Sequence, residues 1–304
     1  MTQQEIYHEP VLLKQSVDGL NINPSGIYVD VTFGGGGHSK EILSRLGPDG
    51  KLFAFDQDLD ALKNEIDDSR FTLINENFGF MKRFLRFYGV QKVHGILADL
   101  GVSSHQFNEG SRGFSTRFDA RLDMRMNQES DLDAIKVLNT YEEEDLIRIF
   151  KEYGELRNAA KLARYIVDAR ATRTIETIAQ LKKICAPLVP ARIEHKLLAQ
   201  VFQAIRIEVN NEMQVLHDFL IQSQQILVKG GRLSVISYHS LEDRPVKRFI
   251  RNGMFEGEPE KDVFGRVEVP FKKVGGLIVP SDEELRVNNR SRSAKLRIAE
   301  KITD

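Results

Sequence analysis

Five short apolar runs, each bounded by turn-forming residues, predict buried β-strands along the chain. These runs cover Ile27–Phe33, Lys51–Phe55, Thr72–Asn75, Gly95–Ala98 and Arg232–Ser237, and a sixth run at residues 294–301 predicts a final strand. Segments with helical spacing, at residues 39–47, 60–66 and 79–89, separate the early runs. This alternation of strands and helices predicts an α/β fold with a doubly wound, mostly parallel, Rossmann-like sheet covered by helices on both faces.

The alternation of strands and helices stops after Ser104. Residues 105–209 contain no convincing strand, and the segment "EEEDLIRIFKEYG" places Leu146, Ile149 and Phe150 at helical spacing. The sequence therefore predicts two domains, a discontinuous core of residues 1–104 and 210–304 and an inserted all-helical domain of residues 105–209. Residues 195–227 are expected to form one long helical stretch, and residues 253–289 an irregular tail.

Composition places few limits on function. The chain has 304 residues, 41% of them hydrophobic, and a formal net charge of -1, so a large core is expected. With one cysteine, Cys185, and no apolar stretch long enough to span a membrane, a cytoplasmic protein is expected. Residues 286–301 hold six basic residues and one acidic residue, and such local clusters indicate either one charged face or an ordinary solvated surface.

The most unusual segment is a run of four glycines, residues 34–37, which follows the first predicted strand and precedes His38. Glycines permit a tight turn and let a ligand approach the backbone closely. The dinucleotide fingerprint G-x-G-x-x-G is incomplete, because its last position is Ser39. The acid Asp30 ahead of the glycines resembles the first motif of S-adenosylmethionine methyltransferases. A glycine-rich turn without a ligand is the alternative.

Polar and aromatic residues follow the next three predicted strands, at the sheet edge where doubly wound folds bind ligands. Asp56 ends the second strand about 20 residues after the glycines, where an acid accepts hydrogen bonds from ribose hydroxyls in both NAD and S-adenosylmethionine sites. Phe78 follows the third strand and is either an adenine contact or a core residue. Asp99 ends the fourth strand and places a carboxylate where chemistry would occur.

Several longer motifs together resemble one family, the bacterial methyltransferases that modify the exocyclic amine of a decoding-centre cytidine in small-subunit (16S) ribosomal RNA (RsmH, formerly MraW). The motifs occur in order along nearly the whole chain: "HEPVLL", "DVTFGGGGHS", "DLGVSSHQF", "RGFS", "LDMRM", "FQAIRIEVNNE", "SYHSLEDRPVKRF" and "NRSRSAKLR". The resemblance implies a 16S rRNA cytosine N4-methyltransferase that uses S-adenosyl-L-methionine, with a helical insert for RNA recognition.

Site residues follow from the resemblance and from charge. The resemblance implies cofactor contacts from Gly36, Gly37, His38, Asp56, Phe78, Asp99 and Gln106. We expect Asp99, or a carbonyl beside it, to accept a hydrogen bond from the target amine, so that Asp99 is the candidate catalytic residue. A cofactor-positioning role explains Asp99 equally well. Because RNA binding requires phosphate contacts, the candidate RNA-binding residues are Arg112, Arg125, Arg290, Arg292, Lys295 and Arg297.

Some alternatives stay open at this point. His239 is a candidate general base, although a cap on the following helix through Ser240 explains the turn better, and Tyr238 is a candidate base-stacking residue. The expected partner is 16S rRNA or the small ribosomal subunit; no metal ion or membrane is expected, and either a monomer or a homodimer fits. A methyltransferase of another RNA base, an NAD-dependent dehydrogenase and a non-catalytic RNA-binding module are the alternative functions.

Overall fold

The computed structural model describes residues 10–260, 263–264 and 267–304. The expected N-terminal motif therefore lies partly outside the described residues, because His8 and Glu9 are not among them. The chain divides into two compact units. One unit holds the chain up to Gly101 together with Gln214–Asp304, and the other holds Val102–Met213. The expected boundaries stood at 104/105 and 209/210, so the helical unit takes in three more residues at one end and four at the other.

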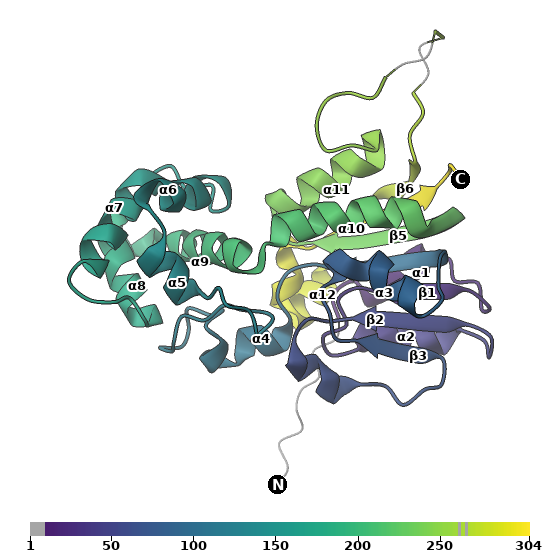
Figure 1. Ribbon diagram of the computed structural model, residues 1–304, viewed down its shortest axis with the longest axis horizontal. Helices are drawn as coiled ribbons and strands as arrows, with labels where there is room; N and C mark the ends of the chain where they lie inside the picture. Colours follow the sequence, from purple (N-terminus) through teal and green to yellow (C-terminus); the bar gives the residue numbers. More distant parts are fainter. Residues whose placement is uncertain (1–9, 261–262, 265–266) are drawn as a thin grey trace. The chain divides into compact units, whose positions relative to one another are not determined.

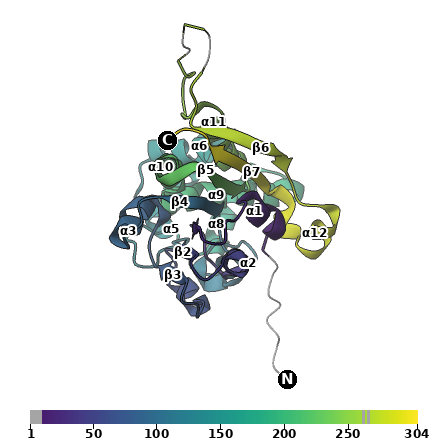
Figure 2. The ribbon, with the colours of Figure 1, turned by 90° about the vertical axis from the view of Figure 1, so that its right-hand side faces the viewer.

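The first unit is built on a sheet of seven strands among the described residues, in the order β3-β2-β1-β4-β5-β7-β6. Its strands are β1 (Ile27–Asp30), β2 (Lys51–Phe55), β3 (Phe71–Ile74), β4 (Val93–Asp99), β5 (Leu227–Ser237), β6 (Phe271–Ile278) and β7 (Lys295–Lys301). The first five strands in this order, β3-β2-β1-β4-β5, pair in parallel. Strand β7 pairs antiparallel with both β5 and β6. This confirms the predicted mostly parallel, doubly wound α/β sheet, whose strands are labelled in Figures 1 and 2 together.

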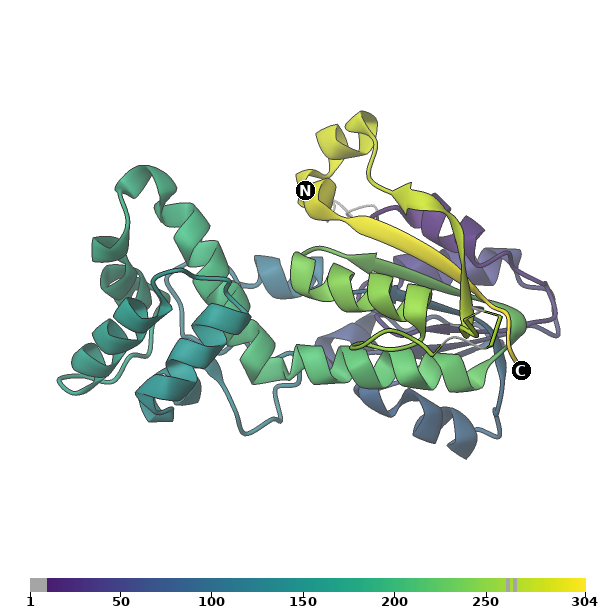
Figure 3. The same ribbon diagram turned by 90° about the horizontal axis from the view of Figure 1, so that it is seen from above.

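Alternate residues of the strands feed two different apolar layers, which explains why helices cover both faces. Phe53 and Phe55 of β2 enter one layer and Leu52 and Ala54 enter the other. The first layer is covered by α3 (Met81–Phe87), α10 (Glu212–Ile226) and α11 (Ser240–Asn252), and the second by α1 (Leu13–Gly19), α2 (Gly37–Arg45) and the 3₁₀ helix η1 (Leu59–Asn64). Figure 2 shows the two groups on opposite sides of the sheet, and Figures 1 and 3 show α10 and α11 side by side.

Two local predictions are wrong. Helix α2 begins at Gly37 with Gly36 as its N-cap, rather than at Ser39, because the Ser39 hydroxyl bonds to Asp30 instead of to the helix. The predicted irregular tail contains β6, α12 (Asp282–Val287) and the 3₁₀ helix η6 (Asn289–Ser293). The long helical stretch expected at residues 195–227 is helical on both sides of a break at Asn211, whose φ of 49° lies in the left-handed region.

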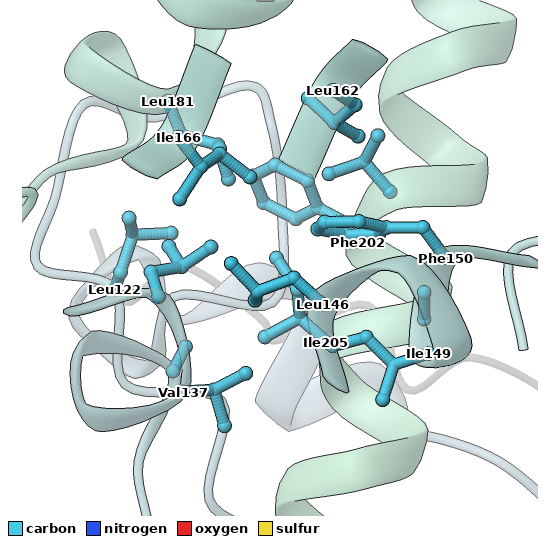
Figure 4. Packing of buried hydrophobic residues seen from close by; sticks show 14 of the residues in the cluster. Leu122, Val137, Leu146, Ile149, Phe150, Leu162, Ile166, Leu181, Phe202 and Ile205 are labelled. Atoms are coloured by element: carbon cyan, nitrogen blue, oxygen red, sulfur yellow. The ribbon is translucent and has the colours of Figure 1, made fainter. Parts of the chain in front are cut away.

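The second unit is helical, as predicted for the insert. Its helices are α4 (Ser104–Asn108), α5 (Ala134–Thr140), α6 (Glu143–Glu152), α7 (Ala159–Arg170), α8 (Ile178–Cys185) and α9 (Glu194–Asn210), with short 3₁₀ turns η3 (Gly110–Arg112), η4 (Ala186–Leu188) and η5 (Ala191–Ile193). Leu146, Ile149 and Phe150 are fully buried in its own apolar core, which Figure 4 shows. The β-pairing found among its described residues is one bridge, between Arg121 and Thr177.

Candidate active site

The glycine loop joins β1 to α2, and its glycines serve different purposes. Gly34 and Gly36 have φ values of 51° and 76°, a conformation that side chains other than glycine rarely adopt. A Cβ on Gly37 would lie 2.1 Å from Pro10 Cγ, so close packing explains this glycine. A Cβ on Gly35 would meet nothing within 4 Å. Protein packing therefore does not require glycine at position 35, and the bare backbone there borders open space that a ligand could occupy.

Asp30 holds the two ends of this loop together. The residue is fully buried, and its Oδ2 accepts the Ser39 hydroxyl at 2.7 Å while its Oδ1 accepts the Thr32 backbone N–H at 3.1 Å. Burial raises the pKa of Asp30 to about 6, although the hydrogen bonds from Ser39 and Thr32 oppose that rise. Asp30 thus fixes the loop onto the start of α2.

Asp56, at the end of β2, also braces the glycine loop. Its Oδ2 accepts the Gly34 N–H at 2.7 Å, and its Oδ1 accepts the Asp58 N–H at 2.9 Å. Burial raises the pKa of Asp56 to about 6. Because each carboxylate oxygen can accept two hydrogen bonds, both oxygens keep capacity for hydroxyl donors. The ribose contact expected of Asp56 stays a prediction that this geometry permits.

The segment after β3 is held against the end of β2 by amide side chains. Asn75 donates to the Asp56 carbonyl at 2.8 Å, and Asn77 donates to Gln57 Oε1 at 2.9 Å. Phe78 begins the short 3₁₀ helix η2 (Phe78–Phe80) and packs edge-on against Phe219, with ring centroids 5.5 Å apart. The half-buried ring thus belongs to the core on one side, and an adenine contact on its remaining surface stays a prediction.

Asp99 lies at the end of β4, next to β1, where the strand order reverses and where doubly wound sheets bind ligands. The Tyr238 hydroxyl donates to Asp99 Oδ1 at 2.7 Å, and the Asp99 backbone N–H donates to Thr32 Oγ1 at 2.7 Å. Asp99 Oδ2 lies 4.0 Å from His38 Nδ1. The carboxylate is therefore oriented by Tyr238 through one oxygen, while the second oxygen faces the imidazole without a direct hydrogen bond to it.

Proton positions around this carboxylate follow from the same contacts. His38 is 5% exposed, and its Nε2 lies 3.2 Å from the Val11 carbonyl, which can only accept, so Nε2 carries the hydrogen. Burial lowers the pKa of His38, against the charge of Asp99, and burial raises the pKa of Asp99 to about 6. In the neutral tautomer, Nδ1 and Asp99 Oδ2 are two acceptors facing each other. A donor group with two N–H bonds that approaches this pair would satisfy one acceptor with each.

The turn after β5 is a helix cap. His239 is the N-cap of α11, and its Nε2 lies 3.1 Å from Glu242 Oε1. Glu242, 2% exposed, accepts the Tyr238 backbone N–H at 2.7 Å through Oε2. The expectation of a cap was right, but the N-cap residue is His239 rather than Ser240. The sequence indicates Tyr238 as a candidate for stacking on a base, whereas in the structure its hydroxyl contacts Asp99, an interaction that the sequence alone does not reveal.

Gln106 belongs to the helical unit. In α4 the side-chain Oε1 of Gln106 accepts the Ser103 backbone N–H at 3.0 Å, while the Gln106 backbone N–H donates to Ser103 Oγ at 3.2 Å. These two hydrogen bonds make a capping box. The side chain is 4% exposed. Its cofactor contact stays a prediction.

The six cations expected to bind RNA differ in their surroundings. Arg112 is 5% exposed, and its guanidinium donates to the carbonyls of Arg125 and Met126 at 3.0 and 3.2 Å, so Arg112 braces the helical unit from inside. Arg125 is paired with Asp123 at 2.7 Å. Two further cations share one carboxylate, because Arg297 pairs with Asp243 at 2.7 Å and Lys295 lies 3.9 Å from it.

The remaining two cations, Arg290 and Arg292, lie on η6, and Arg292 is exposed. Of the six, Arg292 therefore offers the most accessible charge. Burial removes Arg112 from direct reach of a phosphate, a difference that charge counting along the sequence could not detect.

Three features fit a nucleoside cofactor that carries an amino acid in place of phosphates. They are the bare backbone at Gly35, the acid Asp56 after β2, and the carboxylate of Asp99 where the strand order reverses. Fold and site together define a Rossmann-like methyltransferase dependent on S-adenosylmethionine. Comparison with known families agrees, since the model of the MraW methylase family matches residues 5–302. The chain belongs to the MraW methylase family.

Curated relatives match over nearly the full length of both chains. Proteins named ribosomal RNA small subunit methyltransferase H are 67% identical over 296 residues in Christiangramia forsetii (97% of this chain, 98% of the relative) and 68% identical over 302 residues in Flavobacterium johnsoniae (99% and 100%). The relative of that name from Phocaeicola vulgatus is 56% identical over 299 residues, which is 98% of each chain. Family membership excludes the dehydrogenase and the non-catalytic module. Among the described helices, none has the length and apolar character needed to cross a bilayer.

Proposed function

We propose that this protein methylates the exocyclic N4 amine of a cytidine in small-subunit (16S) ribosomal RNA, with S-adenosyl-L-methionine as the methyl donor. Its membership of the MraW methylase family and the shared name of its relatives support the substrate. The observation that carries the chemistry is Asp99, a carboxylate at the switch point that Tyr238 orients through a 2.7 Å hydrogen bond. Because ribosomal subunits are assembled in the cytoplasm of bacteria, the proposal places the enzyme there.

The chemical difficulty is that the lone pair of the cytosine amine is delocalised into the ring. When bound, S-adenosylmethionine supplies an electrophilic methyl group on its sulfonium. Asp99 Oδ2 is the oxygen that Tyr238 does not engage, and it would accept a hydrogen bond from the amine, which favours a tetrahedral nitrogen with a localised lone pair. A fixed acceptor also aligns the amine, and alignment of this kind supplies a large part of many enzymatic accelerations.

The proton released after transfer can pass to Asp99. A carboxylate whose burial raises its pKa to about 6 is a stronger base than an ordinary aspartate, although it is still mostly ionised at neutral pH. His38 Nδ1, 4.0 Å from Asp99 Oδ2, is a second acceptor near the same point. In this proposal Gly36, Gly37, Asp56, Phe78 and Gln106 bind the cofactor. The candidate cations other than buried Arg112 contact the RNA.

The experiment uses small subunits purified from a strain that lacks the gene for this enzyme. The purified protein and labelled S-adenosylmethionine should add one methyl group to a cytidine, located by nuclease digestion and mass spectrometry of the rRNA. Label on another base would overturn the cytidine assignment. Naked 16S transcript serves as a parallel substrate, and we expect the assembled subunit to react faster because the near-neutral chain has modest affinity for free RNA.

Asp99→Ala tests the chemical role within the same assay. Turnover should be lost while calorimetry finds normal binding of S-adenosylmethionine. If the variant instead loses only cofactor affinity and regains full turnover at saturating cofactor, Asp99 positions the cofactor and the catalytic assignment is wrong. Asp99→Asn, which keeps an acceptor oxygen and removes the charge, should retain partial activity.

A further inference from the structure

A groove with a volume of about 340 Å³ lies on the catalytic unit, where α11 packs beside β6 and β7. Figure 2 shows these three elements together at one edge of the sheet. The apolar side chains of its lining are Ile250 of α11 and Phe271 of β6, which share one apolar cluster. Ile298 of β7 also borders the groove, but its side chain packs against α1 on the other face of the sheet. This volume lies within the range of small-molecule sites, roughly 300–1,000 Å³. None of these residues takes part in the site around Asp99.

Four cations surround this apolar floor. Lys247 and Lys273 are exposed, and neither ammonium has a carboxylate partner among the described residues. Arg251 lies 4.0 Å from Glu258, a pair whose side chains are 64% and 77% exposed and which water therefore screens. Only Arg297 is held firmly, through Asp243. The groove is thus positively charged although the whole chain carries a net charge of -1.

We propose that this groove binds an unpaired nucleotide of the RNA substrate, at a distance from the methylated base. An apolar floor ringed by cations suits a nucleobase with its flanking phosphates, the combination that proteins use to hold single-stranded nucleic acid. An acidic peptide would match the charge, but its carboxylates would leave the apolar floor without a partner. The inference rests on the proposed function for the identity of the RNA, while binding of single-stranded RNA can be measured without methylation.

Gly276 of β6 offers a way to fill the groove without disturbing the fold. The residue lines the groove, its backbone is not in the left-handed region, and a Cβ added to it would meet nothing within 4 Å. Gly276→Leu should therefore fold normally and occupy the space meant for the base. Gly276→Ala is the matched control, because its single methyl group leaves most of the volume open.

Charge reversal provides the second test. The double variant Lys247→Glu, Lys273→Glu is compared with Lys14→Glu, Lys51→Glu, which makes the same change of net charge at exposed lysines on α1 and β2. Binding of a fluorescently labelled oligouridine to the full-length protein is followed by anisotropy at several salt concentrations. We expect the groove double variant to raise Kd roughly tenfold or more over the control, and to reduce the salt slope by about 1.4, the loss of two phosphate contacts to a single strand.

In the methylation assay, the groove variants should raise KM for small subunits and leave kcat and cofactor affinity unchanged. Equal Kd values for the groove and control double variants, or unchanged binding by Gly276→Leu, would overturn the proposal. So would displacement of the oligouridine by polyglutamate as effective as displacement by unlabelled oligouridine, since the groove would then accept an acidic polypeptide. If the wild type binds oligouridine through the groove but methylates no subunit, the proposed function fails and the groove stands.

Discussion

The hydrogen bond between Tyr238 and Asp99 gives the sharpest prediction, because Tyr238→Phe removes one oxygen atom and leaves the aromatic ring in place. That hydroxyl donates to Asp99 Oδ1 at 2.7 Å and stabilises the ionised carboxylate, whose pKa burial raises to about 6. A hydrogen bond to a charged group contributes about 1.5–3 kcal/mol, and one pKa unit corresponds to about 1.4 kcal/mol. The pKa of Asp99 in the variant should therefore rise by about one to two units.

The consequence is a shift in the pH profile of turnover rather than a uniform loss. With the pKa moved to about 7–8, the ionised fraction of Asp99 at pH 7 falls from about nine-tenths to between about one-half and one-tenth. We expect kcat at neutral pH to fall about two- to tenfold and to recover in alkaline buffer, as the carboxylate ionises again.

The assay measures initial rates at saturating subunits and cofactor across the pH range, with Tyr88→Phe, a partly exposed tyrosine on the surface, as the control. Calorimetry checks that cofactor affinity is unchanged at each pH. A variant whose activity falls equally at every pH, with the acidic limb of the profile unmoved, would refute the reasoning. Tyr238 would then act by contacting the base and not by tuning Asp99.

Two further predictions concern the loop around the cofactor. The pKa of Asp30 is raised to about 6, so its contribution to stability is complete below the unfolded pKa of about 4 and is lost as pH rises through about 6. In urea titrations, the stability of Asp30→Asn relative to the wild type should therefore increase by about 3 kcal/mol between acidic and neutral pH. A stability difference that does not change with pH would contradict this. Gly35→Ala should leave thermal stability unchanged but weaken cofactor binding, whereas Gly37→Ala should cost about 1–3 kcal/mol of stability because its methyl group would collide with Pro10. Calorimetry with a thermal melt separates the two glycines, and normal cofactor affinity in Gly35→Ala would show that the open space is not the cofactor's.

Buried strands were the part of the fold that the sequence predicted well. Strands β1 to β5 are covered on both faces, so they stand out as short apolar runs. Strand β6 could not be found in this way, because most of its residues are exposed at the sheet edge and two of them, Gly275 and Gly276, disfavour strands. The break at Asn211 was hidden for a different reason, since asparagine tolerates the left-handed region without the glycine that usually marks a helix end.

Candidate site residues were predictable where one strand end carries one polar residue, as Asp56 and Asp99 do. What the sequence could not supply is the pairing between distant segments. Tyr238 and Asp99 are 139 residues apart, and no periodicity relates them. Counting charges along the sequence likewise cannot distinguish Arg292, which is exposed, from Arg112, which is buried and donates to two backbone carbonyls inside the helical unit.

The insertion of the helical unit between β4 and β5 has a consequence for synthesis on the ribosome. Strands β1 to β4, the glycine loop and Asp99 are all translated first, and β5 follows only after the whole helical unit. Until then β4, whose side chains are mostly buried in the finished sheet, presents an unpaired apolar edge of the kind that recruits other strands. Because the helical unit has its own core, it can fold early and bring β5 close to β4, which shortens the time for which the edge of β4 stays unpaired. The glycine loop and Asp99 are thus synthesised well before Tyr238, the residue that orients the Asp99 carboxylate.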